Sequence, residues 1–319
     1  MNKYPLVDPY EDGTVVTSDG HRLYWEVSGN PAGTPAVMLH GGPGSGASPG
    51  WRRYFDPDRY RLIQFDQRGC GRSTPHAADD PDLSSHTMPR LLADIEAVRL
   101  ACGVDRWVVC GGSWGSTLGL AYAQAFPWRI RALILFSVVG TRPSDVEWIT
   151  RGVGRFRPEA FAAFRDAVPP ELRDGSLAWA YTRMLADPDP AVVERAASAW
   201  VCWEDAVAGV GPDPRFADVR FRRGFVRLVS WYWAHHAWMG ESQLLDGVGR
   251  LAGVAGVLIH GGVDVGSPPE FAWGLARRWP DAVLTVVPDA GHGTGFAGIG
   301  AAFLAATDRH AGGGDFVSG

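Results

Sequence analysis

The sequence predicts an α/β fold in which a mostly parallel sheet carries helices on both faces and one all-helical segment is inserted. Short apolar strands alternate with helical segments at both ends of the chain, a rhythm typical of parallel sheets covered by helices. Between about 141 and 245 this rhythm stops, and prolines separate helical segments without a clear strand. We therefore divide the chain into a first core part (1–140), a helical cap (141–245), a second core part (246–311) and a flexible tail (312–319).

The expected elements begin with a hairpin, because polar and apolar residues alternate from Thr14 to Ser28 around Asp19-Gly20. A helix over Pro89–Leu100 follows from apolar residues spaced three and four positions apart. The other expected strands are 36–39, 60–65, 106–110, 132–136, 256–260 and 282–287, and the other expected helices are 118–125, 269–279 and 299–311.

Composition and charge narrow the class of protein. Of the 319 residues, 46% are hydrophobic and 20% are charged, which is typical of a globular chain with a sizeable core. The 30 basic and 35 acidic side chains give a net charge of -5, which argues against a nucleic-acid partner. The start lacks the apolar centre of a signal peptide and no apolar run is long enough to cross a membrane, so we expect no membrane association. The four cysteines show no C-x-x-C spacing, and we expect reduced thiols in a cytoplasmic protein without a zinc site.

Residues 111–115 read Gly-Gly-Ser-Trp-Gly, a G-x-S-x-G turn between an apolar strand and a helix. In that setting the turn presents a serine hydroxyl beyond the end of the sheet, and the glycines allow the tight bend. The helix that follows points its N-terminus at the serine, which favours negative charge there. Ser113 is therefore the candidate nucleophile, and the alternative is a structural turn with an incidental serine.

A serine nucleophile needs a base, and three histidines follow the cap. In folds with this turn the chain order is serine, then acid, then histidine. His292 lies in a glycine-flanked loop directly after the last expected strand, at the carboxyl edge of the sheet where such sites lie. His260 ends a buried strand and is expected to form hydrogen bonds inside the core, and His310 sits at the end of the final helix. His292 is therefore the candidate base.

The acid that orients this base is expected at the same edge of the sheet. Asp264 lies in the loop after the preceding strand, and it would fix the tautomer of His292 and stabilise its protonated form. Asp289 is the rival candidate, but it is so close in sequence to His292 that a role in capping the loop suits it better.

A tetrahedral intermediate needs hydrogen-bond donors for its oxyanion. One donor is expected to be the backbone NH of Trp114, and the other comes from the loop after an early strand. His40-Gly41-Gly42-Pro43-Gly44 fits that loop, with Gly42 as the donor, although an ordinary Gly-Pro turn is the alternative. Each such donor lowers the activation free energy by on the order of 3 kcal/mol. The charged loop 66–72 is interpreted as a structural set of ion pairs beside the site, because no phosphate-binding motif follows it.

These motifs resemble those of the prolyl aminopeptidases, or proline iminopeptidases, of the α/β-hydrolase fold. The resemblance covers almost the whole chain and rests on HGGPG (40–44), DQRGCGRSTPHA (66–77), ADIEAVR (93–99), GGSWGSTLGLAYAQ (111–124), HGGVD (260–264), WPDA (279–282) and PDAGH (288–292). It implies the α/β-hydrolase fold, a triad of Ser113, Asp264 and His292, and release of an N-terminal proline from short peptides with no metal or other cofactor.

The cap carries a further resemblance in Trp200-Val201-Cys202-Trp203-Glu204. In relatives the glutamate of this motif helps to bind the free amino group of the substrate, which implies substrate binding by Glu204, with Trp203 beside it. A carboxylate in an aromatic-walled pocket suits an ammonium ion. From the residues alone, Glu204 would be interpreted as an ordinary solvated helix residue.

Three departures from the family pattern concern the substrate. The family usually has an arginine at the strand end where this chain has Phe136, and a second amino-binding glutamate where residues 231–236 hold no acid. Gly262-Val263 stands where Arg-Tyr commonly precedes the aspartate. Aromatic side chains replace the charges, namely Phe136, Trp231, Trp233 and Trp238. These aromatic side chains either line the pocket, where Phe136 and Trp233 would bind substrate, or form the core of the cap. If they line the pocket, a bulkier or less charged ligand is favoured.

The leading hypothesis is a serine hydrolase that releases an N-terminal proline or a similar residue from small peptides or amides through an acyl-enzyme. The alternative is a family relative that acts as an esterase, amidase or lactonase on a bulkier apolar small molecule of secondary metabolism. Epoxide or haloalkane opening on this fold would need a carboxylate in place of Ser113. A non-catalytic binding protein would not need an intact triad. A small molecule or a short peptide is thus the expected partner.

Overall fold

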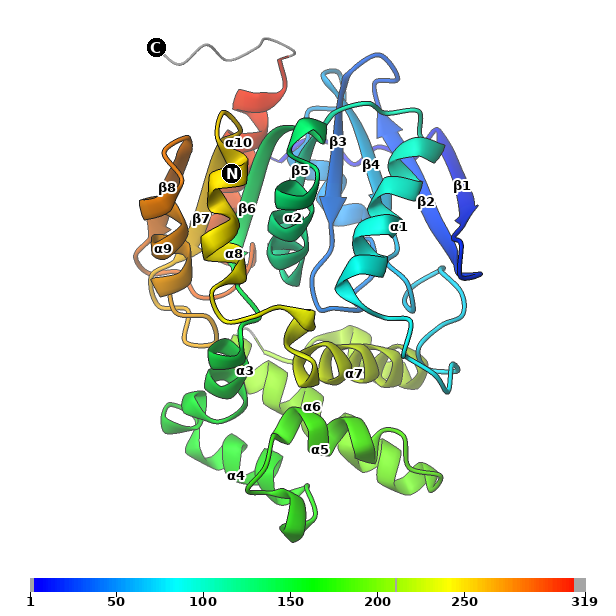
Figure 1. Ribbon diagram of the computed structural model, residues 1–319, viewed down its shortest axis with the longest axis vertical. Coiled ribbons are helices and arrows are strands. Elements are labelled where there is room, and N and C mark those ends of the chain that lie inside the picture. The colour runs from blue at the N-terminus through cyan, green and yellow to red at the C-terminus, as the bar shows by residue number, and fades with distance from the viewer. Residues whose placement is uncertain (1–2, 210, 313–319) are drawn as a thin grey trace.

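The computed structural model describes residues 3–209 and 211–312 and contains an eight-stranded sheet in the order β1-β2-β4-β3-β5-β6-β7-β8 (Figure 1). The pairs β1–β2 and β2–β4 are antiparallel, and every other neighbouring pair is parallel. The strands are β1 (Glu11–Val16), β2 (Arg22–Gly29), β3 (Thr34–Leu39), β4 (Tyr60–Phe65), β5 (Trp107–Ser113), β6 (Ile130–Val138), β7 (Ala255–Gly261) and β8 (Ala282–Val287). The expected mostly parallel sheet is thereby confirmed.

Helices cover both faces of the sheet. They are α1 (Met88–Ala101), α2 (Trp114–Ala125), α8 (Gln243–Asp246), α9 (Glu270–Arg278) and α10 (Ala297–His310). Along β3 the side chains alternate between two apolar clusters, with Val37 and Leu39 in the cluster that holds α1, α2 and α9, and Ala36 and Met38 in the one that holds α10. The two faces of the sheet therefore belong to separate halves of the core.

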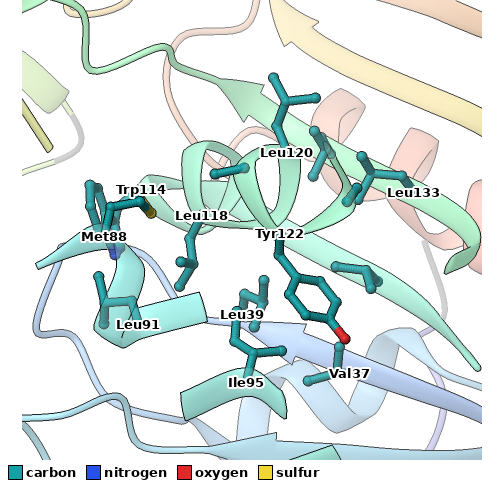
Figure 2. Packing of buried hydrophobic residues seen from close by; sticks show 14 of the residues in the cluster. Val37, Leu39, Met88, Leu91, Ile95, Trp114, Leu118, Leu120, Tyr122 and Leu133 are labelled. Atoms are coloured by element: carbon teal, nitrogen blue, oxygen red, sulfur yellow. The ribbon is translucent and has the colours of Figure 1, made fainter. Parts of the chain in front are cut away.

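The helix after the G-x-S-x-G turn is fixed by its packing on α1. Leu118 and Tyr122 of α2 lie on the side of the helix that faces Leu91 and Ile95 of α1 (Figure 2). The Tyr122 hydroxyl also donates a hydrogen bond of 2.6 Å to Glu96 of α1. Burying an apolar side chain of this size contributes about 1.5–3 kcal/mol, so this contact holds the start of α2 in place.

The segment after β6 forms a separate helical layer at one end of the sheet (Figure 1). Its helices are α3 (Pro143–Thr150), α4 (Pro158–Asp166), α5 (Leu177–Met184), α6 (Pro190–Ala208) and α7 (Val219–Ala234). Within the described part of 141–245, every regular element is helical. Phe164 lies at the centre of this layer, stacked at 4.6 Å on Tyr181 and at 5.3 Å on Trp203. The cap thus has an apolar core of its own.

Two helices of the cap matter most for the site. Helix α6 begins where the Asp189 side chain accepts the Ala191 NH, and it ends at Gly209 with φ 67°, a left-handed value that suits glycine. Helix α7 packs onto the loop after β3, because a Cβ on Gly42 would lie 3.1 Å from the Phe225 ring and one on Gly44 would lie 3.1 Å from Leu228. The cap is therefore seated directly against the predicted oxyanion loop.

None of the described helices combines the length and apolarity needed to cross a membrane. Beyond Gly312, the tail expected over 312–319 lies outside the described residues.

Candidate active site

Ser113 stands between β5 and α2 in a strained backbone conformation, with φ 55° and ψ −127°. The bend requires glycine on either side. A Cβ on Gly111 would lie 2.2 Å from the Gly115 carbonyl oxygen, and a Cβ on Gly115 would lie 2.2 Å from the Leu39 carbonyl oxygen. Both are closer than atoms can approach, so the turn exists only because these positions lack side chains. The Ser116 hydroxyl fastens the bend by donating to the Ser113 carbonyl at 2.6 Å.

The predicted acid and base meet at the carboxyl ends of β7 and β8. The Nδ1 atom of His292 lies 2.6 Å from Oδ2 of Asp264, whose side chain is almost wholly buried. The other carboxylate oxygen accepts the Ser267 NH at 3.0 Å. Burial alone would raise the pKa of Asp264, but the adjacent imidazole outweighs it and the pKa is lowered.

His292 has the electrostatics of a base held by an acid. Burial would lower its pKa, yet the Asp264 carboxylate outweighs burial and Glu204 adds to the effect, so the pKa of His292 is raised above its usual 6.5. The loop is fixed by the Gly293 NH, which donates to the Ser137 hydroxyl at 2.8 Å. With Nδ1 committed to Asp264, Nε2 is the nitrogen left for Ser113. Both residues border the same cavities, and in the described part of the chain no direct hydrogen bond joins them, a contact that often tightens only when substrate binds.

The rival candidates for these roles are placed elsewhere. His260 uses both ring nitrogens, because Nδ1 accepts the Val138 NH at 3.0 Å and Nε2 lies 2.7 Å from the Ser267 carbonyl. It forms hydrogen bonds within the core, as expected. Asp289 is exposed, and the carboxylate that contacts the imidazole of His292 is that of Asp264.

The loop after β3 lies against Ser113. A Cβ on Gly41 would lie 3.3 Å from the Cβ of Ser113, and Gly42 adopts φ 110°, which glycine tolerates. Within the described residues the Gly42 NH has no hydrogen-bond partner. The Trp114 NH is at the first position of α2, ahead of the helical hydrogen bonds. Both NH groups that the sequence predicts as oxyanion donors therefore border a cavity beside Ser113.

A chain of hydrogen bonds holds this loop to the turn. His40 is fully buried, and its Nδ1 lies 3.0 Å from the Gly41 carbonyl while its Nε2 accepts the Gln67 NH at 3.1 Å. The Gln67 side chain donates to the His40 carbonyl at 2.9 Å and accepts from the Trp114 indole at 2.9 Å. Burial lowers the pKa of His40, so the ring is a neutral structural connector. Gln67 was not among the predicted site residues.

Two cavities meet at Ser113. The smaller has a volume of about 100 Å³ and an apolar wall that includes Val146, Ile149 and Val207. The larger has a volume of about 560 Å³, within the range of cavities that hold small molecules. The residues that border both are Gly42, Ser113, Glu204, Ala208 and His292. A scissile bond at this junction would place its two sides in different cavities.

Glu204 projects from α6 to this junction. Its Oε1 accepts a hydrogen bond of 3.0 Å from the Trp200 indole, four residues earlier on the same face of the helix. Burial raises the pKa of Glu204 to about 7, against the opposing effects of that hydrogen bond and of His292. Asp145 also borders the smaller cavity, but it is bound by the Arg142 guanidinium at 2.7 Å. Of the carboxylates that border the smaller cavity, Asp145 and Asp264 are bound to basic side chains, whereas Glu204 is bound only by the Trp200 indole among the described residues.

Known proteins resemble this chain over most of its length. Residues 34–182 match the family described as alpha/beta hydrolase fold. A Streptomyces coelicolor protein named "Probable proline iminopeptidase" is 47% identical over 321 residues, covering 98% of this chain and 99% of that protein. A proline iminopeptidase of Xylella fastidiosa is 42% identical over 295 residues, covering 91% and 93%. The chain belongs to the proline iminopeptidase family. The crystal structure of the Mycobacterium smegmatis proline iminopeptidase aligns with a TM-score of 0.57 at 22% identity, over 94% of this chain and 99% of that one, which shows a shared fold.

The resemblance to proline iminopeptidases is thereby confirmed, and the residues predicted to bind substrate can be placed within the fold. Trp233 borders the smaller cavity and Phe136 the larger. Trp203 differs from the expectation, because its ring is 1% exposed, lies in the cap core and donates to the Ile149 carbonyl at 3.0 Å. Neighbouring residues on a helix point in different directions, so when Glu204 faces the cavity Trp203 faces inward. Trp231 lies near the core, where its indole donates to the His86 carbonyl at 3.2 Å.

The charged loop 66–72 is structural, as its sequence indicates. The Arg68 guanidinium binds Asp94 through two hydrogen bonds of 2.6 and 2.7 Å, with both groups buried. Asp66 accepts hydrogen bonds from the backbone NH and the side chain of Arg72. In the part of the chain that the structure describes, no group of three or more His, Cys, Asp or Glu side chains is arranged to hold a metal ion.

Proposed function

We propose that this member of the proline iminopeptidase family releases an N-terminal proline from short peptides and amides. In this proposal Ser113 is the nucleophile, His292 the base, Asp264 the residue that orients the base, and the Gly42 and Trp114 NH groups the oxyanion donors. The geometry that supports these roles is the His292–Asp264 contact of 2.6 Å and the shared position of Ser113, Gly42 and His292 at the junction of the two cavities.

The proposed reaction has two steps. The Ser113 oxygen attacks the prolyl carbonyl while His292 Nε2 takes the hydroxyl proton, and the oxyanion is held by the two NH groups. The tetrahedral intermediate collapses with loss of the amine, which receives that proton from His292, and leaves a prolyl ester on Ser113. A water molecule then gives a proton to His292 and attacks the ester. Breakdown of the second intermediate returns the proton to Ser113 and frees proline.

The observation that carries the proposal is the position of Glu204 at the cavity junction. A carboxylate there can pair with the secondary ammonium of an N-terminal proline while the ring occupies the smaller cavity. That cavity has room for one small residue, so a longer acyl side would not fit. Cleavage after a single N-terminal residue follows from this arrangement.

Hydrolysis of proline 4-nitroanilide tests the proposal. We expect turnover by the wild-type protein and none by Ser113→Ala. We also expect a fluorophosphonate to label the wild-type protein and not this variant, because the reagent needs the activated hydroxyl. A folded wild-type protein that takes the label but does not release 4-nitroaniline would refute the peptidase activity while retaining a serine hydrolase. Absence of the label would favour a non-catalytic binding protein.

A second candidate function follows from the aromatic wall of the larger cavity. Phe136 stands where relatives usually carry an arginine, and Trp51 lies beside it with ring centroids 5.5 Å apart. This surface suits an esterase, amidase or lactonase acting on a bulky apolar molecule. Faster hydrolysis of aryl esters than of proline 4-nitroanilide would favour this candidate. The four cysteines are free thiols, and we propose a cytoplasmic location for either activity.

A further inference from the structure

An unbroken row of aromatic rings leads away from the nucleophile along the larger cavity. The Phe136 ring lies against the turn, since a Cβ on Gly112 would be 2.1 Å from it. The Trp51 ring follows at 5.5 Å from Phe136, and the Tyr54 ring follows at 5.8 Å from Trp51. All three residues border the cavity.

The backs of these rings are covered. Phe303 of α10 packs 4.7 Å from Phe136, 6.4 Å from Trp51 and 5.2 Å from Tyr54. The rings are therefore held from behind by the core. Phe136 and Tyr54 are only 3% and 2% exposed, so the partly exposed Trp51 supplies most of the aromatic surface that faces the cavity. A wall held in this way is preorganised, so an aromatic group that stacks on it orders few side chains.

A single positive charge stands at the far end of the row. The Nζ atom of Lys3 lies 4.3 Å above the Tyr54 ring, and within the described residues no carboxylate forms an ion pair with it. Its position is fixed by Tyr4, whose NH donates to the Arg53 carbonyl at 3.0 Å and whose hydroxyl donates to Asp308 at 2.9 Å. Lys3 is also the only lysine of the chain.

The two cations that border the larger cavity differ in whether they are already paired. Arg215 is bound by Asp213 at 2.6 Å. The Lys3 ammonium has no such partner among the described residues, so it is the cation suited to receive a carboxylate.

The charges along the larger cavity are complementary to those at the two ends of a short peptide. Glu204 and Asp205 border it at the cap side, and Lys3 borders it beyond the aromatic row. We propose that the larger cavity is a leaving-group site that selects an aromatic residue with a free α-carboxylate, so that dipeptides of proline and an aromatic residue are preferred substrates. The inference rests on the proposed function and names the part of the substrate that leaves.

The first test measures kcat/KM on matched substrates, each divided by the value for prolinamide, whose leaving group is too small to reach the wall. We expect Pro-Phe to exceed Pro-Ala by about 2- to 13-fold, because stacking on aromatic rings contributes about 0.5–1.5 kcal/mol. We expect Pro-Phe to exceed Pro-Phe-amide by about fivefold, the scale of a partly exposed ion pair. Trp51→Ala should remove the first preference and Lys3→Met the second, while Lys3→Arg should retain it.

The second test detects the leaving group without catalysis. Because the chain has one lysine, an amine-reactive ester labels a single side chain, which mass spectrometry separates from the N-terminal amine. We expect 3-phenylpropanoate, which has the ring and carboxylate of phenylalanine but no amine to consume the reagent, to protect Lys3 from the label. We expect 3-phenylpropanamide to protect it far less. Equal protection by both compounds, or none by either, would overturn the proposed carboxylate contact.

The two proposals fail in different ways. Equal rates for Pro-Phe, Pro-Ala and Pro-Phe-amide, in a protein that hydrolyses prolinamide, would overturn the leaving-group site and leave the proposed function intact. Failure to hydrolyse any proline substrate would refute the proposed function, and the substrate preference would fall with it.

Discussion

Replacing Glu204 by glutamine tests the part of the site that distinguishes a peptidase from a general hydrolase. Glutamine keeps the shape of the side chain, and its carbonyl can still accept the 3.0 Å hydrogen bond from Trp200. Only the charge is lost. A hydrogen bond to a charged group contributes about 1.5–3 kcal/mol, so kcat/KM for proline 4-nitroanilide should fall by about 10- to 150-fold.

The pH profile gives this experiment its sharpest readout. In the proposed function Glu204 binds the ammonium group only when ionised. Because its pKa is about 7, kcat/KM of the wild type should fall as pH drops through 7. His292 must be neutral to act as a base, and its raised pKa adds a second loss in the same direction. The glutamine variant loses the first ionisation. It also loses the negative charge that raises the pKa of His292, so its remaining acid limb should move to lower pH.

The assay measures proline 4-nitroanilide and 4-nitrophenyl acetate from pH 5.5 to 9 with both proteins. The ester has no amine, so its hydrolysis at pH 8 should change little in Glu204→Gln. Two results would refute the reasoning. Proline release within twofold of wild type would mean that Glu204 does not bind the amine, and an equal fall for the ester would mean that it acts on His292 instead.

Three further predictions concern the stability of the fold. Ser113→Gly should be inactive yet more stable to urea by about 1 kcal/mol, because glycine adopts φ 55° without strain. Gly115→Ala should lower the free energy of unfolding in urea by about 3 kcal/mol or more, since its Cβ would lie 2.2 Å from a backbone oxygen. Gly119→Ala is the control on the same helix. Its nearest contact would be a side-chain methyl at 3.3 Å, so it should fold normally in the same titration. Chemical denaturation should show Glu204→Gln to be more stable than wild type at pH 8 but not at pH 4.5. The pKa of Glu204 is about 7 in the folded protein, above its ordinary 4.5, so the folded state is destabilised when the carboxylate is ionised. This destabilisation is absent below pH 4.5, grows between pH 4.5 and 7, and reaches up to about 3 kcal/mol above pH 7.

Specific outcomes would contradict these predictions. A Ser113→Gly protein that is less stable than wild type would show that its backbone stores no strain. Equal stability of Gly115→Ala and Gly119→Ala would mean that the turn can move away from β3. A stability difference between Glu204→Gln and wild type that does not vary with pH would show that glutamine changes packing rather than charge.

The sheet was predictable because its signals are local. The expected strands 60–65 and 282–287 coincide with β4 and β8, since each apolar run is bounded by residues that favour turns. Asp264 and His292 could be expected to meet for a similar reason, as each follows the end of a parallel strand and such ends share one edge of the sheet. The order of the strands then fixed the 2.6 Å contact.

Other site residues depended on packing that a linear pattern does not carry. The sequence predicts that Trp203 binds substrate because it is adjacent to Glu204. Adjacent residues on a helix point in different directions, however, and it is Trp200, four residues before Glu204, whose indole contacts the carboxylate. Trp51 and Lys3 lie far before Ser113 in the chain. Trp51 reaches its cavity because β3 pairs with β5, which brings the segment after β3 beside the turn. Lys3 reaches the cavity because the neighbouring Tyr4 NH donates to the Arg53 carbonyl of that segment.

The division of the site between two layers separates its two tasks. Ser113 ends β5 and His292 lies in the loop after β8, whereas Glu204 stands on α6, whose buried apolar side chains pack in the cluster of the cap. The layers touch at the oxyanion loop through Phe225 and Leu228 of α7. Warming or a destabilising change in the cap should therefore blunt discrimination between amines and plain esters before it stops hydrolysis altogether.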